Sequence, residues 1–504
     1  MRGLQTPVRA IRRQVFTEVA KLGFKANAET LVADMEAIPY EIVGEDSEVK
    51  YRESIYRARA VVRERLRLAM GLSLRPENKP VHLTAGVEAS NISEKYYEPP
   101  LMQVIPSGCE SCEENKYEVS NVCKGCLAHP CQEVCPRGAI SMVNGKSFID
   151  QDKCIKCGKC KSVCPYDAIA KKERPCKKAC GVNAITSDKL GRAYIDADKC
   201  VSCGMCMVSC PFAAIADKSQ IFQLSHALRE GTEIIAEVAP AYINQFGEDV
   251  TPGKFRSALK QLGFSNIYEV ALGADIGCIS EAHHYAKEVA TGNLPFLLTS
   301  CCPSWSVMAK KYFPAMIDNI SQELTPMVAT ARIVKKEHPN AKVVFIGPCA
   351  SKKLEAMRHS VRSDVDFVIT FEELWGLFDA KNITPSTCEE LPEETQAATA
   401  AGRGYAIAGG VAGAIENCLK EYYPDVPVHI EHAESLAECK KVLTLAKAGK
   451  IKNCMIEGMA CPGGCIGGAG TNAGFAKTSK ALKKYVDSSE PKLPSQELEN
   501  LELN

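Results

Sequence analysis

The stretch FIDQDKCIKCGKCKSVCPYDAI at residues 148–169 recurs almost column for column as YIDADKCVSCGMCMVSCPFAAI at residues 194–215. Both copies carry the spacing C-x2-C-x2-C-x3-C-P, in which three close cysteines precede a fourth that is followed by proline. CPRGAI at Cys135 and CGVNAI at Cys180 repeat the ends of these units. Four similar half-units therefore follow one another, which predicts a series of like modules.

The composition limits the class of protein. The 504 residues suffice for two to four domains. Sixty-one basic residues balance 61 acidic ones, which argues against a nucleic-acid binder or a polybasic membrane protein. The N-terminal residues lack the apolar core of a signal peptide, and no apolar run is long enough to span a bilayer. We therefore expect a cytoplasmic protein with no membrane or nucleic-acid partner.

Cysteine is the unusual residue type. Sixteen of the 26 cysteines lie between Cys109 and Cys210, and ten lie from Cys278 to Cys465. In a reducing compartment such cysteines bind metal rather than pair as disulfides. The trailing proline and the third close cysteine favour 4Fe–4S clusters over structural zinc.

The ligand sets follow from a rule of this motif, in which the fourth cysteine of one unit binds the cluster of another. Two pairs of cysteines outside complete motifs bring the total to sixteen, enough for four clusters. The predicted sets are Cys123, Cys126, Cys131 and Cys164; Cys154, Cys157, Cys160 and Cys135; Cys200, Cys203, Cys206 and Cys180; and Cys109, Cys112, Cys176 and Cys210.

We expect an α+β multidomain protein. Residues 1–104 form a mostly helical segment, residues 105–218 a ferredoxin-like domain with up to four 4Fe–4S clusters, residues 219–480 an α/β domain, and residues 481–504 a polar tail. In the α/β part, apolar runs that end in Gly, Pro or Cys predict strands that feed loops at one edge of a sheet, where ligands bind. These runs are IIAEVAP, IYEVALG, PFLLTSCC, KVVFIGPC, VDFVITF, GYAIAGG and CMIEGMAC.

Three further cysteine segments have none of the ferredoxin spacings. They are TSCCPSW (299–305), GPCASKKLEA (347–356) and EGMACPGGCIGGAG (457–470). Four of their thiolates can hold a fifth cubane, and the glycines allow the backbone to approach it closely. The different spacing predicts a cluster with a different task.

In this order, the three segments resemble the signature motifs of the FeFe hydrogenases over roughly residues 220–475. The resemblance implies a 4Fe–4S cubane joined through one cysteine to a diiron unit that carries CO, cyanide and azadithiolate and is supplied by maturation proteins. It implies reversible conversion of protons and electrons to H2, with a ferredoxin or flavodoxin as electron partner. By motif the cubane ligands are Cys302, Cys349, Cys461 and Cys465, and Cys465 is the bridge.

The resemblance also assigns roles beside the cluster. It makes Cys301 the proton relay and Lys352 a hydrogen-bond donor to a cyanide ligand. We expect Lys353 to be a solvated surface lysine. The other residues that carry over are Glu281 and Ser321 in the proton path, His284 where a second glutamate is common, Met459 beside the diiron unit, and Ala239 and Pro240 in the loop that lines it.

Some residues depart from the family pattern. Ala241 stands where serine is common, Gly347-Pro348 replaces methionine-proline, and the third motif ends in GGAG. These departures indicate a divergent branch with an altered pocket. Three alternatives remain: a hydrogenase-like iron–sulfur assembly factor without the diiron unit, a hydrogen sensor with the same cluster, and an electron-transfer protein. Cys301-Cys302 and Lys352 argue against the first, no sensor segment is visible for the second, and the third leaves the C-terminal half unexplained.

Overall fold

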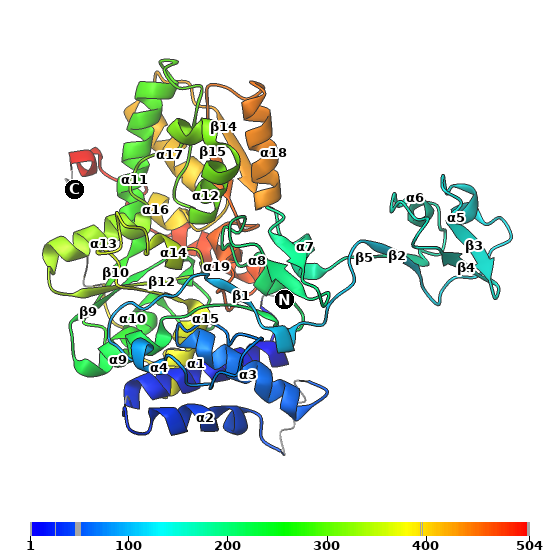
Figure 1. The fold of residues 1–504 in the computed structure, drawn as a ribbon. Coiled ribbons are helices and arrows are strands. Elements are labelled where there is room, and N and C mark those ends of the chain that lie inside the picture. Colours follow the sequence, from blue (N-terminus) through cyan, green and yellow to red (C-terminus); the bar gives the residue numbers. More distant parts are fainter. Residues whose placement is uncertain (1–2, 26, 46–51, 394, 396, 501–504) are drawn as a thin grey trace.

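The computed structural model describes residues 3–25, 27–45, 52–393, 395 and 397–500. Figure 1 shows a helical layer at the bottom, an α/β body above it, and a small lobe that stands away from the body on two strands. The predicted fold class is confirmed, because helical, cysteine-rich and α/β parts follow one another along the chain. In the described residues, no helix has both the length and the apolar character needed to cross a bilayer.

The N-terminal helices pack on the α/β body. α1 buries Val15, Phe16 and Val19 against α9 and α15 of the body. This apolar face joins the largest core of the protein. The helices concerned are α1 (Pro7–Lys25), α2 (Leu31–Ile42), α3 (Ile55–Ala69), α4 (Val87–Ser90), α9 (Ile221–Glu230) and α15 (Phe371–Ala380).

The first cysteine repeat forms the separate lobe, which we call the knob (residues 120–168). Its stalk is the antiparallel pair β2 (Lys116–Val119) and β5 (Ile169–Lys172). The knob contains the hairpin β3 (Ile140–Val143) and β4 (Lys146–Ile149), with the short helices α5 (Pro130–Glu133) and α6 (Lys159–Ser162). In Figure 1 only the stalk joins the knob to the rest of the protein.

The second cysteine repeat lies against the body instead. β1 pairs with β8, so the segment just before the cysteine block and the end of that block meet in one antiparallel pair. β6 and β7 form a second such pair. The elements are β1 (Met102–Val104), α7 (Pro175–Lys178), β6 (Ile185–Ser187), β7 (Ala193–Ile195), α8 (Met205–Ser209) and β8 (Ile215–Asp217).

The α/β body contains two parallel sheets, whereas the sequence predicts one sheet edge. The four-stranded sheet has the order β10-β9-β12-β13, and the three-stranded sheet has the order β11-β15-β14. The strands divide because β9 pairs with β12 while β11 pairs with β15. The strands are β9 (Ile234–Val238), β10 (Asn266–Glu269), β11 (Phe296–Leu298), β12 (Lys342–Gly347), β13 (Phe367–Thr370), β14 (Ile430–Glu434) and β15 (Cys454–Met459).

Helices cover both sheets, and several of them start where a strand has just ended. α12 begins at Pro303, directly after Cys302, and α14 begins at Lys352. The helices of the body not yet named are α10 (Pro252–Leu262), α11 (Val270–His284), α12 (Pro303–Tyr312), α13 (Pro326–Glu337), α14 (Lys352–Glu355), α16 (Ala400–Gly404), α17 (Gly410–Tyr422), α18 (Leu436–Lys447) and α19 (Phe475–Asp487).

Two sequence predictions are wrong in this half. GYAIAGG (404–410) is not a strand but the turn between α16 and α17, because its backbone bonds to the cysteine-bearing loop. Ala408 N–H donates to Gly463 O at 3.2 Å, and Ile466 N–H donates to Ala406 O at 3.1 Å. The predicted boundary at 480 falls inside α19, which continues to Asp487 because Leu482 is fully buried.

Lys353 is buried, so the prediction of a surface lysine is also wrong. Its ammonium forms ion pairs at 2.7 Å with Asp217 of β8 and with Glu373 of α15. It also donates to Lys218 O at 2.9 Å. Burial lowers the pKa of Lys353, but the two carboxylates outweigh it and hold that pKa above its usual value. Lys353 thus joins the cysteine-rich part to the α/β body.

Lys353→Met should lower the free energy of unfolding by about 3–5 kcal/mol, because it leaves two buried carboxylates without a counter-charge. Thermal unfolding followed by circular dichroism measures the change. Lys480→Met, on the exposed face of α19, is the matched control and should stay within about 0.5 kcal/mol of the wild type. An unchanged midpoint for Lys353→Met would contradict this role.

Candidate functional site

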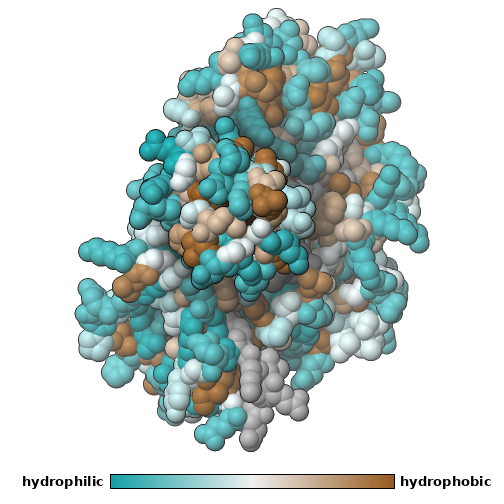
Figure 2. Space-filling view, turned by 90° about the vertical axis from the view of Figure 1, so that its right-hand side faces the viewer, coloured by the Kyte–Doolittle hydropathy of each residue, from teal (hydrophilic) through white to brown (hydrophobic). Residues whose placement is uncertain are grey.

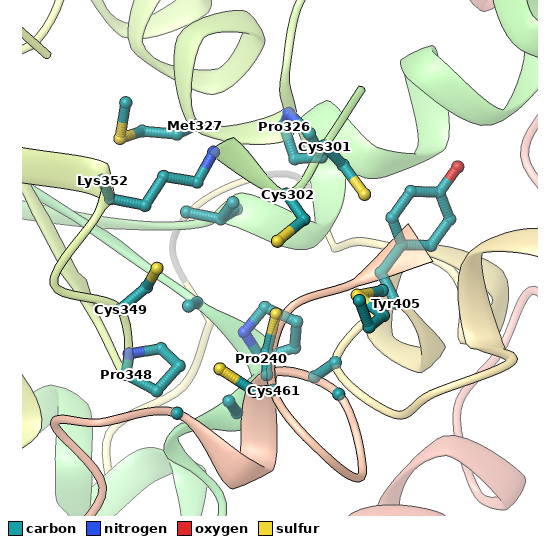
Figure 3. A pocket seen from close by; sticks show the side chains of 18 of the residues that line it. Pro240, Cys301, Cys302, Pro326, Met327, Pro348, Cys349, Lys352, Tyr405 and Cys461 are labelled. Carbon is teal, nitrogen blue, oxygen red and sulfur yellow. The ribbon is translucent and has the colours of Figure 1, made fainter. Parts of the chain in front are cut away.

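The functional cavity lies between the carboxyl ends of the two sheets. It has a cavity volume of about 90 Å³ and is lined almost entirely by apolar groups and thiols. Lys352 is the one charged residue among the residues that line it. Figure 3 shows the sulfur atoms of Cys302, Cys349 and Cys461 facing a common space, with Lys352 on one side and Tyr405 on the other.

Each predicted cubane ligand stands just past a strand or at a helix start. Cys302 follows β11 and directly precedes α12. Cys349 follows β12 by two residues, and Cys461 follows β15 by two residues. Cys465 begins a short 3₁₀-helix. Parallel strands end at the same edge, so residues from distant parts of the chain meet at this cavity.

The thiols of the cavity are close enough to influence one another. Burial, with a smaller contribution from the nearby Cys349, raises the pKa of Cys302 to about 11. Burial, with smaller contributions from Cys349 and Cys302, raises the pKa of Cys465 to about 12. Thiols in these surroundings stay protonated at neutral pH unless a metal binds them and stabilises the thiolate. The donor set therefore fits an iron–sulfur cubane, which thiolates hold.

The described residues contain no group of three or more His, Cys, Asp or Glu side chains gathered around one ion-sized point. A cubane does not require such a group, because each of its four irons binds its own thiolate.

Two glycines let the third cysteine segment close around the cavity. Gly464 has φ +82°, and a Cβ there would lie 2.5 Å from the backbone nitrogen of Ala408. A Cβ on Gly468 would lie 2.5 Å from Pro348 O. The loop thus packs directly on the 404–410 turn and on the second cysteine segment, which no larger residue permits.

Lys352 is held in place by two partners. It is 8% exposed, lies 2.6 Å from the Glu355 carboxylate, and lies 3.3 Å from Thr325 Oγ1. Burial lowers the pKa of Lys352, but Glu355, together with the thiolate forms of Cys349 and Cys301, more than offsets this and keeps that pKa above its usual value. A permanently charged donor next to the thiols suits an anionic ligand. Sequence reasoning missed Glu355, although its i,i+3 spacing from Lys352 is a signal for a helical pair.

Cys301 lies beside the cavity and next to Glu281, as predicted for the start of a proton path. Burial raises the pKa of Glu281 to about 7, offset in part by the Ser321 hydroxyl. Ser321 Oγ also accepts from Glu323 N–H at 3.3 Å. The structure therefore brings Cys301, Glu281 and Ser321 together, with a carboxyl that titrates near neutral pH.

The other predicted residues lie at different distances from the cavity. Met459, Ala239 and Pro240 line it directly. His284 does not; it lines a polar surface depression with His283, Glu288 and Glu323. His284 is thus at the solvent end of this region rather than in its interior.

Tyr405 was missed because its segment was read as a strand. It lines the cavity, and its buried hydroxyl has no hydrogen-bond partner among the described residues. Burial raises its pKa well above the usual value, and the charged forms of Cys278 and Glu281 raise it further. The hydroxyl therefore stays protonated and adds a hydrogen-bond donor near Cys301 and Glu281.

Three of the four predicted ferredoxin-type sets gather closely enough to shift one another's pKa. Cys160 lies near Cys154, Cys157 and Cys135. Cys206 lies near Cys203, Cys200 and Cys180. Cys176 lies near Cys210 and Cys109, and Cys112 lies near the same two. For the remaining set, Cys131 and Cys164 share one buried cluster of the knob.

The four half-units also share a hydrogen bond to sulfur. In each, the fourth cysteine accepts from the backbone N–H of the alanine four residues later. The pairs are Cys135 with Ala139 at 3.3 Å, Cys164 with Ala168 at 3.4 Å, Cys180 with Ala184 at 3.2 Å, and Cys210 with Ala214 at 3.4 Å. Such bonds favour the thiolate form, so the repeat extends from spacing to local geometry.

The thiol sets are arranged in series. Cys203 lies near Cys302 of the cavity, and Cys206 lies near Cys176 of the next set. Cys112 precedes β2 by four residues and Cys176 follows β5 by four residues, so their set stands at the foot of the stalk. The two knob sets lie beyond it. This order suits stepwise transfer of electrons between the knob and the cavity.

The comparisons with known proteins match the α/β body and the cysteine-rich part separately. Residues 232–469 match the family model described as iron only hydrogenase large subunit, C-terminal domain. Residues 123–174 and 170–221 each match the LdpA Fe-S cluster-binding domain. The C-terminal half of the chain is therefore similar to the hydrogenase family, and the cysteine-rich part is similar to an iron–sulfur-cluster-binding domain that it matches twice.

The relatives include both hydrogenases and assembly proteins. Iron hydrogenase 1 of Clostridium pasteurianum is 28% identical over 277 residues, which are 47% of this chain and 48% of that protein. Cytosolic iron-sulfur assembly component 3 of Bos taurus is 23% identical over 288 residues, 47% of this chain and 60% of that protein. The match thus spans about half of the first of these relatives.

Among solved structures, the [FeFe]-hydrogenase HydA1 from Chlamydomonas reinhardtii aligns with a TM-score of 0.45 and 21% identity, covering 53% of this chain and 88% of that one.

Gly464→Ala should disturb the loop that bears Cys461 and Cys465, because it forces an L-residue into positive φ and against the Ala408 backbone. We expect a loss of about 1–3 kcal/mol in unfolding free energy and of roughly four irons per reconstituted chain. Gly413→Ala in α17, where a Cβ meets nothing within 4 Å, should keep its iron. Equal iron content in both variants would contradict the role of the loop.

The raised pKa of Glu281 predicts a dependence of stability on pH. The folded protein retains the proton of Glu281 up to about pH 7. The protonated carboxyl therefore makes its full contribution to the free energy of unfolding below the usual glutamate pKa, and this contribution is lost as the pH rises through 7. The Glu281→Gln variant does not show this decrease, because its amide does not ionise. Its unfolding free energy should rise relative to the wild type between pH 5 and 8, by about 3 kcal/mol. A difference that stays constant over this range would disprove the shift.

Proposed function

We propose that this chain is an FeFe hydrogenase that reversibly converts protons and electrons into molecular hydrogen. The observation that carries the proposal is the apolar cavity in which thiols from three distant segments meet a buried lysine and the adjacent Cys301. A protein that only transfers electrons does not need such a cavity. The hydrogenase-family match over residues 232–469 supports the same reading.

In this proposal four cysteines would hold the cubane, and Cys465 would be the one that also binds the diiron unit. The ligands are Cys302, Cys349, Cys461 and Cys465. When bound, the diiron unit with its CO, cyanide and azadithiolate ligands would supply the site at which protons and electrons combine. The protein supplies binding, orientation and electrostatics.

The remaining residues of the cavity act on charge and protons. Lys352 donates to an anionic ligand and is kept cationic by Glu355. The apolar walls around Ala239, Pro240 and Met459 exclude water, which strengthens that interaction. Cys301 holds a proton beside the cavity, and Glu281 and Ser321 exchange it outward. Glu281 suits this task because its carboxyl titrates near neutral pH.

The sixteen cysteines of the ferredoxin-type sets would hold up to four 4Fe–4S clusters, which would supply one-electron transfer. We propose a ferredoxin or flavodoxin as the outer electron partner, and dedicated maturation proteins as the source of the diiron unit. We place the activity in the cytoplasm, where thiols stay reduced.

The second candidate is a scaffold for iron–sulfur assembly. The match to cytosolic iron-sulfur assembly component 3 favours it, because it covers a similar share of the chain to the hydrogenase match. A scaffold holds cubanes but does not bind the diiron unit.

The test is anaerobic hydrogen evolution from a reduced viologen, after the diiron unit is supplied to cluster-reconstituted protein. We expect rapid evolution, and a loss of at least about 100-fold in Cys301→Ala, since general acid–base groups contribute about 10²–10⁴-fold. Cys388→Ala, a buried cysteine that does not line the cavity, should retain full activity. A bound diiron unit without turnover would overturn the enzyme in favour of a sensor, and no binding would favour the scaffold.

A further inference from the structure

The two cysteine repeats present the same loop to different surroundings. In the body copy, Val201 is 4% exposed and its carbonyl accepts from Ser304 Oγ of α12 at 2.9 Å. Cys203 of this loop packs in the same core cluster as Cys302 of the cavity. The loop of the second repeat is therefore the contact through which that repeat meets the hydrogenase-family domain.

In the knob copy the equivalent loop faces solvent. Ile155, which corresponds to Val201, is 56% exposed. All 26 cysteines lie in the part of the chain that the structure describes, and Cys157, which corresponds to Cys203, is the only one that is exposed. The same loop is thus built twice, and in the knob the described residues leave Ile155 and Cys157 exposed, although Tyr117 of the stalk lies against Gly158 of the loop.

The charge of this loop differs between the copies as well. The knob stretch KCIKCGKCK (153–161) has four lysines and no acidic residue, whereas KCVSCGMCM (199–207) has one lysine. Lys156 and Lys159 replace Ser202 and Met205. Arg137 lies two residues beyond Cys135, which is near Cys160 of the same set. Lys156, Lys159 and Arg137 are exposed and have no ion-pair partner in the described part of the chain.

We propose that this surface, formed by Arg137, Ile155, Lys156, Cys157 and Lys159, is the docking site for an acidic one-electron carrier protein. Its cations steer and orient a partner of opposite charge, and Ile155 offers an apolar contact at the centre. Cys157 brings its cluster to the surface at this point. Figure 2 looks onto the face from which the knob projects and shows hydrophobic and hydrophilic side chains interspersed on it.

The stalk leaves this surface accessible. The knob is joined to the body through β2 and β5 alone in Figure 1, so a carrier protein can approach it without meeting the body. Gly158, next to Cys157, lies against Tyr117 of the stalk strand β2, so electrons that enter here would have a short route through the stalk to the sets of Cys176 and Cys206. The inference rests on one part of the proposed function, namely that this chain accepts electrons from a carrier protein.

The test measures electron transfer without hydrogen and without the diiron unit. A reduced, acidic ferredoxin is mixed in a stopped-flow cell with the full-length, cluster-reconstituted chain, and the bleaching of the clusters gives a second-order rate constant. Lys156→Glu/Lys159→Glu should lower this constant by about tenfold or more at low ionic strength and weaken its dependence on salt. Lys156→Arg/Lys159→Arg should leave it within about twofold of the wild type.

Lys483→Glu/Lys484→Glu is the matched control, because it reverses two exposed charges on α19 of the body. It should leave the rate constant unchanged. Reduction by dithionite and the visible absorption of the clusters should be the same in all variants. If the glutamate variant loses its cluster, Arg137→Glu, outside the loop of three ligands, gives the same test.

Wild-type rates in the knob variants, or an equal loss in the body control, would overturn the docking site. Because the assay needs no hydrogen chemistry, it separates a wrong docking site from a wrong proposed function.

Discussion

The structure depends on one constraint: several thiols lie close together and away from water, where forming their thiolates costs free energy. In the cavity burial raises the pKa of Cys302 and Cys465, and the neighbouring thiolates add to the effect. Without a metal these groups stay neutral, and with iron the thiolate becomes the stable form. Binding of the cluster and formation of the surrounding structure are therefore linked, and the glycine-rich loop and buried Lys352 are arranged around this one requirement.

The two parallel sheets meet that requirement by joining distant segments. β11, β12 and β15 deliver Cys302, Cys349 and Cys461 to a common space. The turn between α16 and α17 supports the third cysteine segment through two backbone hydrogen bonds. Lys353 connects the same region to the cysteine-rich part through Asp217. The site is thus fixed by contacts between elements far apart in sequence.

The sequence carries local information about the site more reliably than long-range information. Cysteine spacing predicted which thiols gather, since three of the ferredoxin-type sets lie together as expected. The 404–410 segment was misread because its apolar pattern resembles a strand, while its hydrogen-bond partners lie near residue 463. Lys353 was misread because its two carboxylate partners are distant in the chain. The division into two sheets depends on strand pairing, which no local pattern reveals.

The most direct test of this account is the infrared spectrum of the cluster-reconstituted chain after it has been mixed with the diiron unit and freed of excess by gel filtration. The account predicts sharp CO and cyanide bands that stay with the wild-type protein and are lost in Cys465→Ala. Bands that remain in Cys465→Ala, or a wild-type protein that retains none, would contradict the claim that this cavity holds the diiron unit through its buried thiols.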